Sequence, residues 1–184
     1  MTATSALLHE VNAFNLSAAS ENKIHDDTVA KKFGFRGGLV PGVEVYAYMT
    51  NLPVRQFGAD WLSSGSLDCR FQKPVYDGRT VVATGQLEED GSVTLKVESE
   101  RVLCGSGSAA MGHGQAAPSV AKYAVAPLPD YDTRPAAAPE ALIEGQCMGT
   151  FEQVMDADDL GQYLIDVRED SDLYAAEKIV HPGW

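Results

Sequence analysis

One stretch of the chain, residues 38–57, has apolar residues nearly all round the helix that it would form. These residues are Val43, Val45, Tyr46, Ala47, Tyr48, Met49 and Leu52. This pattern is typical of a helix enclosed by protein on every side. Pro41 lies near the first helical position, where its missing N–H costs nothing, and Pro53 should kink or end the helix. The pattern predicts a buried central helix, with a shorter helix over residues 26–33.

After Gly58 the apolar residues recur at every second position. One alternating run covers residues 67–71 and another covers residues 93–97, and a further strand is expected around residues 109–117. Two Asp-Gly pairs lie between such runs, at 77–78 and 90–91, and Asp-Gly is a strong signal for a tight hairpin. One buried helix followed by antiparallel strands predicts an α+β fold in which the sheet wraps around the helix. This arrangement is the hot-dog fold.

A cluster of prolines divides the chain. They are Pro127, Pro129, Pro135 and Pro139. Because proline has no N–H to donate, we interpret residues 126–141 as an extended connector. It separates a body, residues 1–125, from a tail, residues 142–184, which is close to the lower size limit for folding alone.

The tail repeats part of the pattern of the body. In the body, the acidic pair at 26–27 is followed by an alanine and then by the Leu-Val-Pro-Gly of residues 39–42. In the tail, the acidic residues at 170 and 172 are followed by alanines and then by the Ile-Val-His-Pro-Gly of residues 179–183. Repetition of this kind indicates a duplicated unit. We therefore predict that the tail is a partial second hot-dog repeat.

Composition narrows the class of protein. The 184 residues carry 14 Lys+Arg and 26 Asp+Glu, so the net charge is −12, which argues against binding to nucleic acid. The longest apolar runs fall short of the roughly 18–20 residues that a membrane span needs, and no basic segment suggests a signal peptide. Three cysteines without a Cys-x-x-Cys pair suit a reducing compartment. We expect a cytoplasmic protein without a membrane partner.

Residues 20–27 (SENKIHDD) and 34–42 (GFRGGLVPG) carry a resemblance to a known family. Together with residues 71–78 (FQKPVYDG), they resemble the MaoC-like, or (R)-specific enoyl-CoA hydratase, family over about the first 120 residues. The signature of that family is Gly-Asp-x-Asn-Pro-x-His, followed by an acidic region and a small-residue turn that ends in glycine at the start of the central helix. The resemblance supports the hot-dog prediction.

The resemblance implies roles for three residues. In the family, an aspartate and a histidine share a water molecule that adds across the double bond of an enoyl thioester, and His25 matches this histidine. Asn22 matches the asparagine of the signature. Gly42 matches the glycine whose backbone N–H polarises the thioester carbonyl, with the help of the helix dipole. Each also has a plainer interpretation, in which His25 binds local backbone, Asn22 makes a turn and Gly42 starts a helix.

The sequence departs from the signature at its aspartate. Ser20 stands five residues before His25, where the family has the catalytic aspartate, and serine cannot act as a carboxylate base. Lys23 also replaces the proline of the signature. Glu21 is one position late and, in an extended segment, would point to the opposite face. In an irregular loop Glu21 could still reach the site. The candidate catalytic residues are therefore His25, Glu21 and Asn22, and the candidate substrate-binding residues are Ser20 and Gly42.

Three functions remain open from the sequence. The first is a hydro-lyase that adds water to an enoyl thioester, or removes it from a 3-hydroxyacyl thioester, attached to CoA or to a carrier protein. The second is a non-catalytic acyl-thioester-binding or structural protein, and the third is an acyl-thioester thioesterase. The four histidines lack metal-ligand spacing, and nucleotide-binding glycine motifs are absent, so neither a metal nor a cofactor is expected. Because a single hot-dog sheet leaves an edge exposed, we expect a homodimer or higher homo-oligomer.

Overall fold

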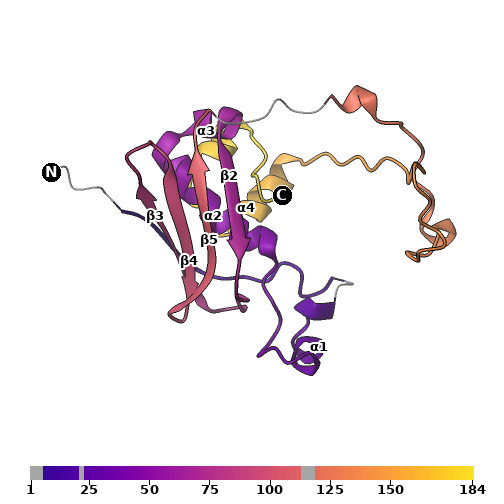
Figure 1. Cartoon of the computed structure of the whole chain (residues 1–184), viewed down its shortest axis with the longest axis horizontal. Helices are drawn as coiled ribbons and strands as arrows, with labels where there is room; N and C mark the ends of the chain where they lie inside the picture. Colours follow the sequence, from indigo (N-terminus) through magenta and orange to yellow (C-terminus); the bar gives the residue numbers. More distant parts are fainter. Residues whose placement is uncertain (1–5, 21–22, 113–118) are drawn as a thin grey trace. The chain divides into compact units, whose positions relative to one another are not determined.

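The computed structural model describes residues 6–20, 23–112 and 119–184 (Figure 1). The chain forms two compact units. The first comprises Met1–Gly114 together with Asp156–Trp184, and the second comprises Gln115–Met155. The predicted connector, residues 126–141, lies inside the second unit, which contains only the short 3-10 helices η2 (Val120–Lys122) and η3 (Tyr131–Thr133) among its described residues.

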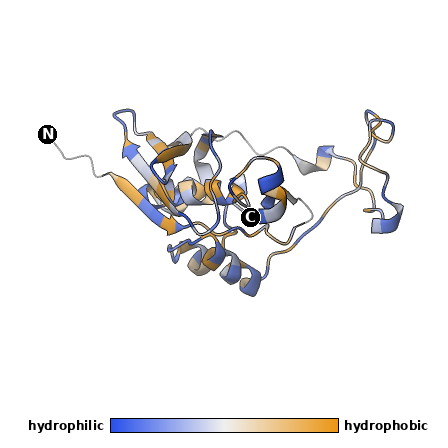
Figure 2. Ribbon diagram, turned by 90° about the horizontal axis from the view of Figure 1, so that it is seen from below, coloured by the Kyte–Doolittle hydropathy of each residue, from blue (hydrophilic) through white to orange (hydrophobic). Residues whose placement is uncertain are grey.

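A five-stranded antiparallel sheet forms one layer of the first unit, in the order β1-β3-β4-β5-β2. The strands are β1 (Leu7–Asn12), β2 (Ser66–Phe71), β3 (Thr80–Leu87), β4 (Val93–Ser99) and β5 (Val102–Ala110). Alternate residues of β4 are buried and exposed, and Figure 2 shows hydrophobic and hydrophilic residues alternating along the strands. The alternating runs predicted at 67–71 and 93–97 are confirmed as β2 and β4.

One prediction about the sheet is wrong. The Asp-Gly pair at 77–78 makes no hairpin, because β2 pairs with β5 and β3 pairs with β1. The strand expected around residues 109–117 overlaps the end of β5, and its residues 113–117 lie outside the described residues. β5 begins at Val102, after the two-residue turn Glu100-Arg101 that follows β4. Both turn residues have positive φ angles, 52° and 65°, although neither is glycine or asparagine, so the usual turn signal was missing. The pair at 90–91 does connect β3 to β4, as predicted.

Helix α2 (Gly42–Phe57) packs against the sheet and confirms the predicted central helix. Its apolar residues Tyr48, Met49 and Leu52 are fully buried, while Val43 is an exception at 55% exposed. Pro53 does not end the helix, which continues to Phe57 before α3 (Ala59–Ser64). The shorter helix predicted at 26–33 is α1 (Asp27–Lys32). Sheet and central helix together form the predicted α+β hot-dog fold.

The C-terminal segment, Asp156–Trp184, completes the first unit with α4 (Ala157–Asp166) and α5 (Leu173–Glu177). Asn51 of α2 donates hydrogen bonds to Glu169 (2.8 Å) and Asp170 (3.0 Å), and Arg55 pairs with Asp170 at 2.5 Å. The segment is thus anchored on the central helix. Its origin as a partial second repeat stays a prediction. Across the part of the chain that the structure describes, no helix has the length and apolarity to cross a membrane.

Candidate functional site

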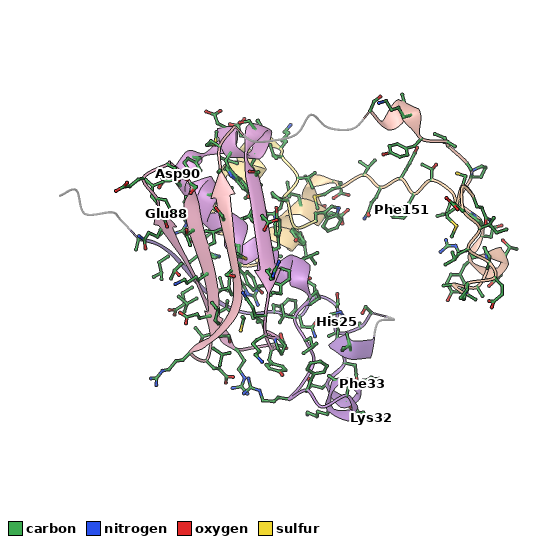
Figure 3. The ribbon with its side chains drawn as sticks, in the orientation of Figure 1. His25, Lys32, Phe33, Glu88, Asp90 and Phe151 are labelled. Atoms are coloured by element: carbon green, nitrogen blue, oxygen red, sulfur yellow. The ribbon has the colours of Figure 1, made fainter. Side chains whose placement is uncertain are left out.

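His25 ends the 3-10 helix η1 (Lys23–His25), a short segment that precedes α1 (Figure 3). The ring is half-buried, and its Nδ1 lies 2.6 Å from the carbonyl oxygen of Leu39. Because a carbonyl only accepts, Nδ1–H is the donor, and Nε2 is the basic nitrogen of the neutral ring. The carbonyl of His25 in turn accepts a 2.8 Å bond from Asn15 Nδ2. Ring and backbone of His25 are therefore both held by hydrogen bonds.

The turn before α2 lies very close to the His25 backbone. Gly38 donates its N–H to Asp27 Oδ1 at 2.7 Å, and a Cβ atom at this position would overlap the carbonyl of His25. Asp26 caps α1 by accepting from the N–H groups of Thr28 and Val29, both at 2.9 Å. Because Gly38 has no side chain, the backbone of His25 can pack against the turn that precedes α2.

An apolar cavity of about 380 Å³ lies at the N-terminus of α2. Its lining residues are Phe35, Leu39, Val40, Gly42, Val45, Phe71, Gln72, Lys73, Pro74 and Val75. Leu39, which binds the His25 ring, and Gly42, which begins α2, both belong to this lining. The first N–H groups of a helix have no carbonyl four residues back to bind, and the helix dipole makes this end positive. An oxygen that carries negative charge is stabilised at such a position.

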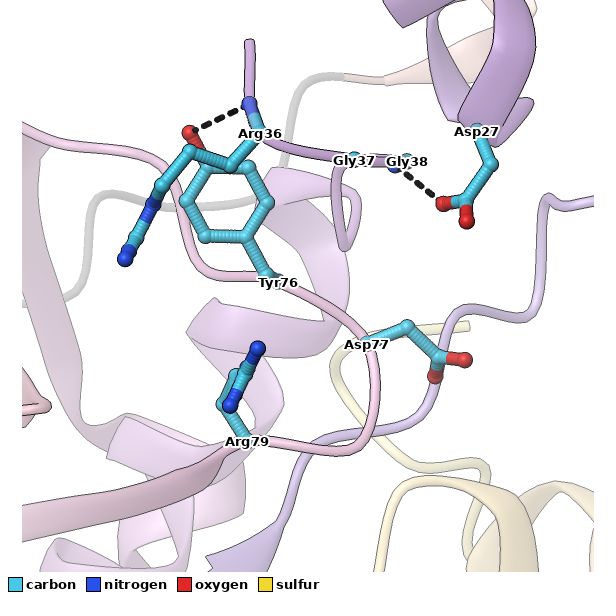
Figure 4. A pocket seen from close by; sticks show the side chains of 7 residues that line it. All are labelled: Asp27, Arg36, Gly37, Gly38, Tyr76, Asp77 and Arg79. Carbon is cyan, nitrogen blue, oxygen red and sulfur yellow. Dashed lines mark hydrogen bonds between the residues drawn. The ribbon is translucent and has the colours of Figure 1, made fainter. Parts of the chain in front are cut away.

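A second, polar cavity, of about 170 Å³, is lined by Asp27, Arg36, Gly37, Gly38, Tyr76, Asp77 and Arg79 (Figure 4). The backbone N–H of Arg36 donates to the hydroxyl of Tyr76 at 3.4 Å, and its guanidinium lies 4.6 Å from the centre of the Tyr76 ring. Glu100 pairs with Arg36 at 2.6 Å and with Arg79 at 3.5 Å, and it raises the pKa of Arg36. These contacts tie the turn before α2 to the β4–β5 hairpin.

Glu44 is a buried carboxyl group in the first turn of α2 that the sequence analysis did not single out. It is 3% exposed, and its Oε2 has no hydrogen-bond partner among the described residues. Burial raises its pKa from 4.5 to about 6, against the opposing effects of its own backbone N–H and of the charge on His25. An acidic residue two positions after Gly42, inside an apolar run, was the available signal.

Comparisons with known proteins found similar structures but no matching sequence family. No family model matches the sequence, and no curated protein matches it. Among solved structures, an (R)-hydratase from A. caviae involved in PHA biosynthesis is 19% identical, with a TM-score of 0.46 over 59% of this chain and 95% of the other. A MaoC-like dehydratase from Phytophthora capsici is 18% identical, with a TM-score of 0.49 over 59% of this chain and 42% of the other. A predicted thioesterase from Bacillus stearothermophilus is 12% identical, with a TM-score of 0.41 over 60% of this chain and 81% of the other.

Three of the five predicted site residues lie in the described part of the chain. Leu39 connects His25 to Gly42. Its carbonyl binds the His25 ring, and Leu39 and Gly42 line the same cavity. Ser20 is half-buried in a turn, where its N–H donates to the carbonyl of Ser17 at 2.9 Å. Glu21 and Asn22 lie outside the described residues, so their pairing with His25 stays a prediction. Within residues 6–20, 23–112 and 119–184, no group of three or more His, Cys, Asp or Glu could hold a metal ion.

Proposed function

We propose that the protein is a hydro-lyase that acts on an enoyl or 3-hydroxyacyl thioester. The observation that carries the proposal is the hydrogen bond from the His25 ring to Leu39, a residue that lines the apolar cavity at the N-terminus of α2. This bond supports a position of the ring in which Nε2 can exchange a proton with a substrate bound in the cavity. An acyl chain suits an apolar cavity, and a thioester carbonyl suits the positive end of a helix.

The proposed reaction needs one basic group and one site for negative charge. The oxygen of water bonds to the β-carbon of the enoyl thioester while a proton of this water passes to Nε2 of His25. The π electrons of the carbon–carbon double bond move toward the thioester carbonyl, whose oxygen accepts a hydrogen bond from the N–H of Gly42. The imidazolium then returns its proton to the α-carbon. Water is added overall, and the reverse sequence is dehydration.

The test is hydration of crotonyl-CoA, followed by loss of the absorbance of the enoyl thioester. His25→Ala is expected to lower kcat/KM by about a hundredfold or more, the usual contribution of a general acid–base group. Lys32→Ala changes an exposed residue of the neighbouring helix α1 and serves as the matched control, with activity like wild type. Full activity of His25→Ala would overturn the proposal, and so would release of free CoA without hydration.

A second function, binding of an acyl thioester without catalysis, is favoured by Ser20. This residue stands where the resembling family has its catalytic aspartate. Ser20→Asp separates the two functions. A wild-type protein that is inactive and gains hydration through Ser20→Asp is a binding protein that keeps the pocket of the family. An active wild-type protein that loses hydration through His25→Ala supports the hydro-lyase.

A further inference from the structure

The ring of Phe71 lies beside the first residue of α2. Phe71 is the last residue of β2, which forms one edge of the sheet, and its side chain is 46% exposed. A Cβ atom on Gly42 would lie 3.1 Å from Cε2, 3.4 Å from Cδ2 and 3.8 Å from Cζ of this ring. These are the three nearest atoms outside α2 and the adjacent residues. Phe71 is therefore the side chain that limits the space next to Gly42.

A second glycine supports the other edge of the same ring. Phe71 lies opposite Gly105 in the antiparallel pairing of β2 with β5. A Cβ atom on Gly105 would lie 3.5 Å from Cδ1 of Phe71. Because Cδ1 and Cδ2 are on opposite edges of a phenyl ring, the ring lies between the backbone of β5 and the backbone of α2. The glycines at both contacts allow the ring to approach these backbones closely.

The Phe71 ring also forms part of the wall of the apolar cavity. Phe71, Gly42 and Val45 all line this cavity, whose volume is about 380 Å³. Pro41, the residue before α2, makes no side-chain hydrogen bond that caps the helix, so no capping side chain occupies its first N–H groups. An oxygen that accepts a hydrogen bond from the N–H of Gly42 would therefore be bound close to the Phe71 ring.

We propose that Phe71 is a specificity-determining residue that selects thioesters without a branch at the α-carbon. This inference rests on the proposed function, in which the thioester carbonyl binds the N–H of Gly42. The α-carbon is bonded directly to the carbonyl carbon, so a methyl branch there needs the space beside Gly42 that the ring fills. The β-carbon and the rest of an unbranched chain lie further from Gly42. The ring therefore disfavours the branched substrate and admits the unbranched one.

Binding of saturated thioesters, which cannot be hydrated, tests the inference without reference to activity. Isothermal titration calorimetry of the wild type is expected to give a Kd about tenfold lower for butyryl-CoA than for 2-methylbutyryl-CoA, and Phe71→Ala should remove this preference. Leu103→Ala is the matched control, because it shortens a comparably exposed apolar side chain of β5, 40% exposed, that does not line the cavity. This control should keep the wild-type preference. Equal affinities in the wild type, or an unchanged preference in Phe71→Ala, overturn the proposal.

Kinetics supply the second test. Phe71→Ala is expected to raise kcat/KM for hydration of 2-methylcrotonyl-CoA relative to that of crotonyl-CoA by about tenfold. Phe71→Leu keeps an apolar side chain at the end of β2 and should give an intermediate ratio. A ratio that stays at the wild-type value in both variants overturns the proposal. If the wild type hydrates neither thioester, the proposed function fails, while the Kd values still decide whether Phe71 discriminates against the branch.

Discussion

His25 and His181 use their ring nitrogens in opposite ways. Nδ1 of His25 donates to the carbonyl of Leu39 at 2.6 Å, whereas Nδ1 of His181 accepts from the backbone N–H of Gly183 at 3.0 Å. The proton of a neutral His181 therefore sits on Nε2, which faces Glu169 Oε2 at 3.5 Å. His25 is half-buried beside a cavity, and His181 is 1% exposed.

The surroundings of His181 explain this difference. Its ring packs between Tyr163 and Tyr174, with ring centres 5.6 Å and 4.7 Å away. Glu169, whose side chain is also buried, accepts hydrogen bonds from Asn51 of α2 and from the backbone N–H of Ser171, both at 2.8 Å. Among these contacts, the bond from Asn51 to Glu169 joins the C-terminal segment to α2, and the others lie within the segment. The comparison teaches that His181 holds the fold together, while the environment of His25 leaves it suited to chemistry.

The largest effect is expected from Glu169→Ala. This change leaves His181, Asn51 and the backbone of Ser171 without their buried acceptor, so the free energy of unfolding should fall by about 3 kcal/mol. Urea denaturation measures the loss. Glu177→Ala removes an exposed carboxylate from α5 and should change stability by less than about 0.5 kcal/mol. Equal stability of the two variants would remove the structural role assigned to Glu169.

Replacing each histidine by alanine tests the comparison directly. His181→Ala should lower the free energy of unfolding by about 2 kcal/mol, because it opens a cavity and removes the imidazole nitrogen that faces the carboxylate of Glu169. His25→Ala removes one hydrogen bond from a half-buried site and should cost about 1 kcal/mol. Thermal unfolding of both variants gives the ranking. A greater loss in His25→Ala than in His181→Ala would reverse the roles of the two residues.

The parts of the molecule that local sequence determines were predictable, and those that distant contacts determine were not. The buried helix α2 and the hairpin at Asp90-Gly91 follow from patterns within a few residues. The pairing of His181 with Glu169 does not follow from such a pattern, because helix α5 separates the two residues in sequence. Asn51 and Glu169 are 118 residues apart in sequence, and no periodicity reports such a contact.

The candidate site divides in the same way. The motif around His25 and the glycine at the start of α2 were visible as a pattern of residue types. The burial of Glu44 was not, because the sequence does not show which side of α2 the fold encloses: the apolar neighbour Val43 is exposed and the acidic Glu44 is buried. The carboxyl group that the sequence analysis expected near the histidine is that of Glu21, which lies outside the described residues.

Glu44 gives a pH-dependent contrast with Glu169. Its pKa rises from 4.5 to about 6 in the folded state, so the stability associated with it is complete below pH 4.5 and is lost as the pH rises through 6. This shift corresponds to about 2 kcal/mol. Glu44→Gln does not ionise, so its stability relative to wild type should increase by that amount between pH 4 and pH 8. Urea denaturation at both pH values measures this, with the exposed Glu10→Gln as control. A constant difference would contradict the burial of an ionisable Glu44.

The smallest effects on stability are expected at two helix N-caps. One is Asp26, next to His25, and the other is Asp156, in the C-terminal segment that contains His181. Asp26 accepts from the N–H groups of Thr28 and Val29 at the start of α1, and Asp156 accepts from the N–H of Asp159 at the start of α4. Replacing either cap by alanine should cost about 1 kcal/mol of stability. Their effects on crotonyl-CoA hydration should differ, because α1 follows His25 directly whereas α4 belongs to the C-terminal segment. Asp26→Ala is expected to lower kcat/KM several-fold and Asp156→Ala to leave it unchanged. Equal losses of activity would mean that the His25 region depends on general stability rather than on its own local order.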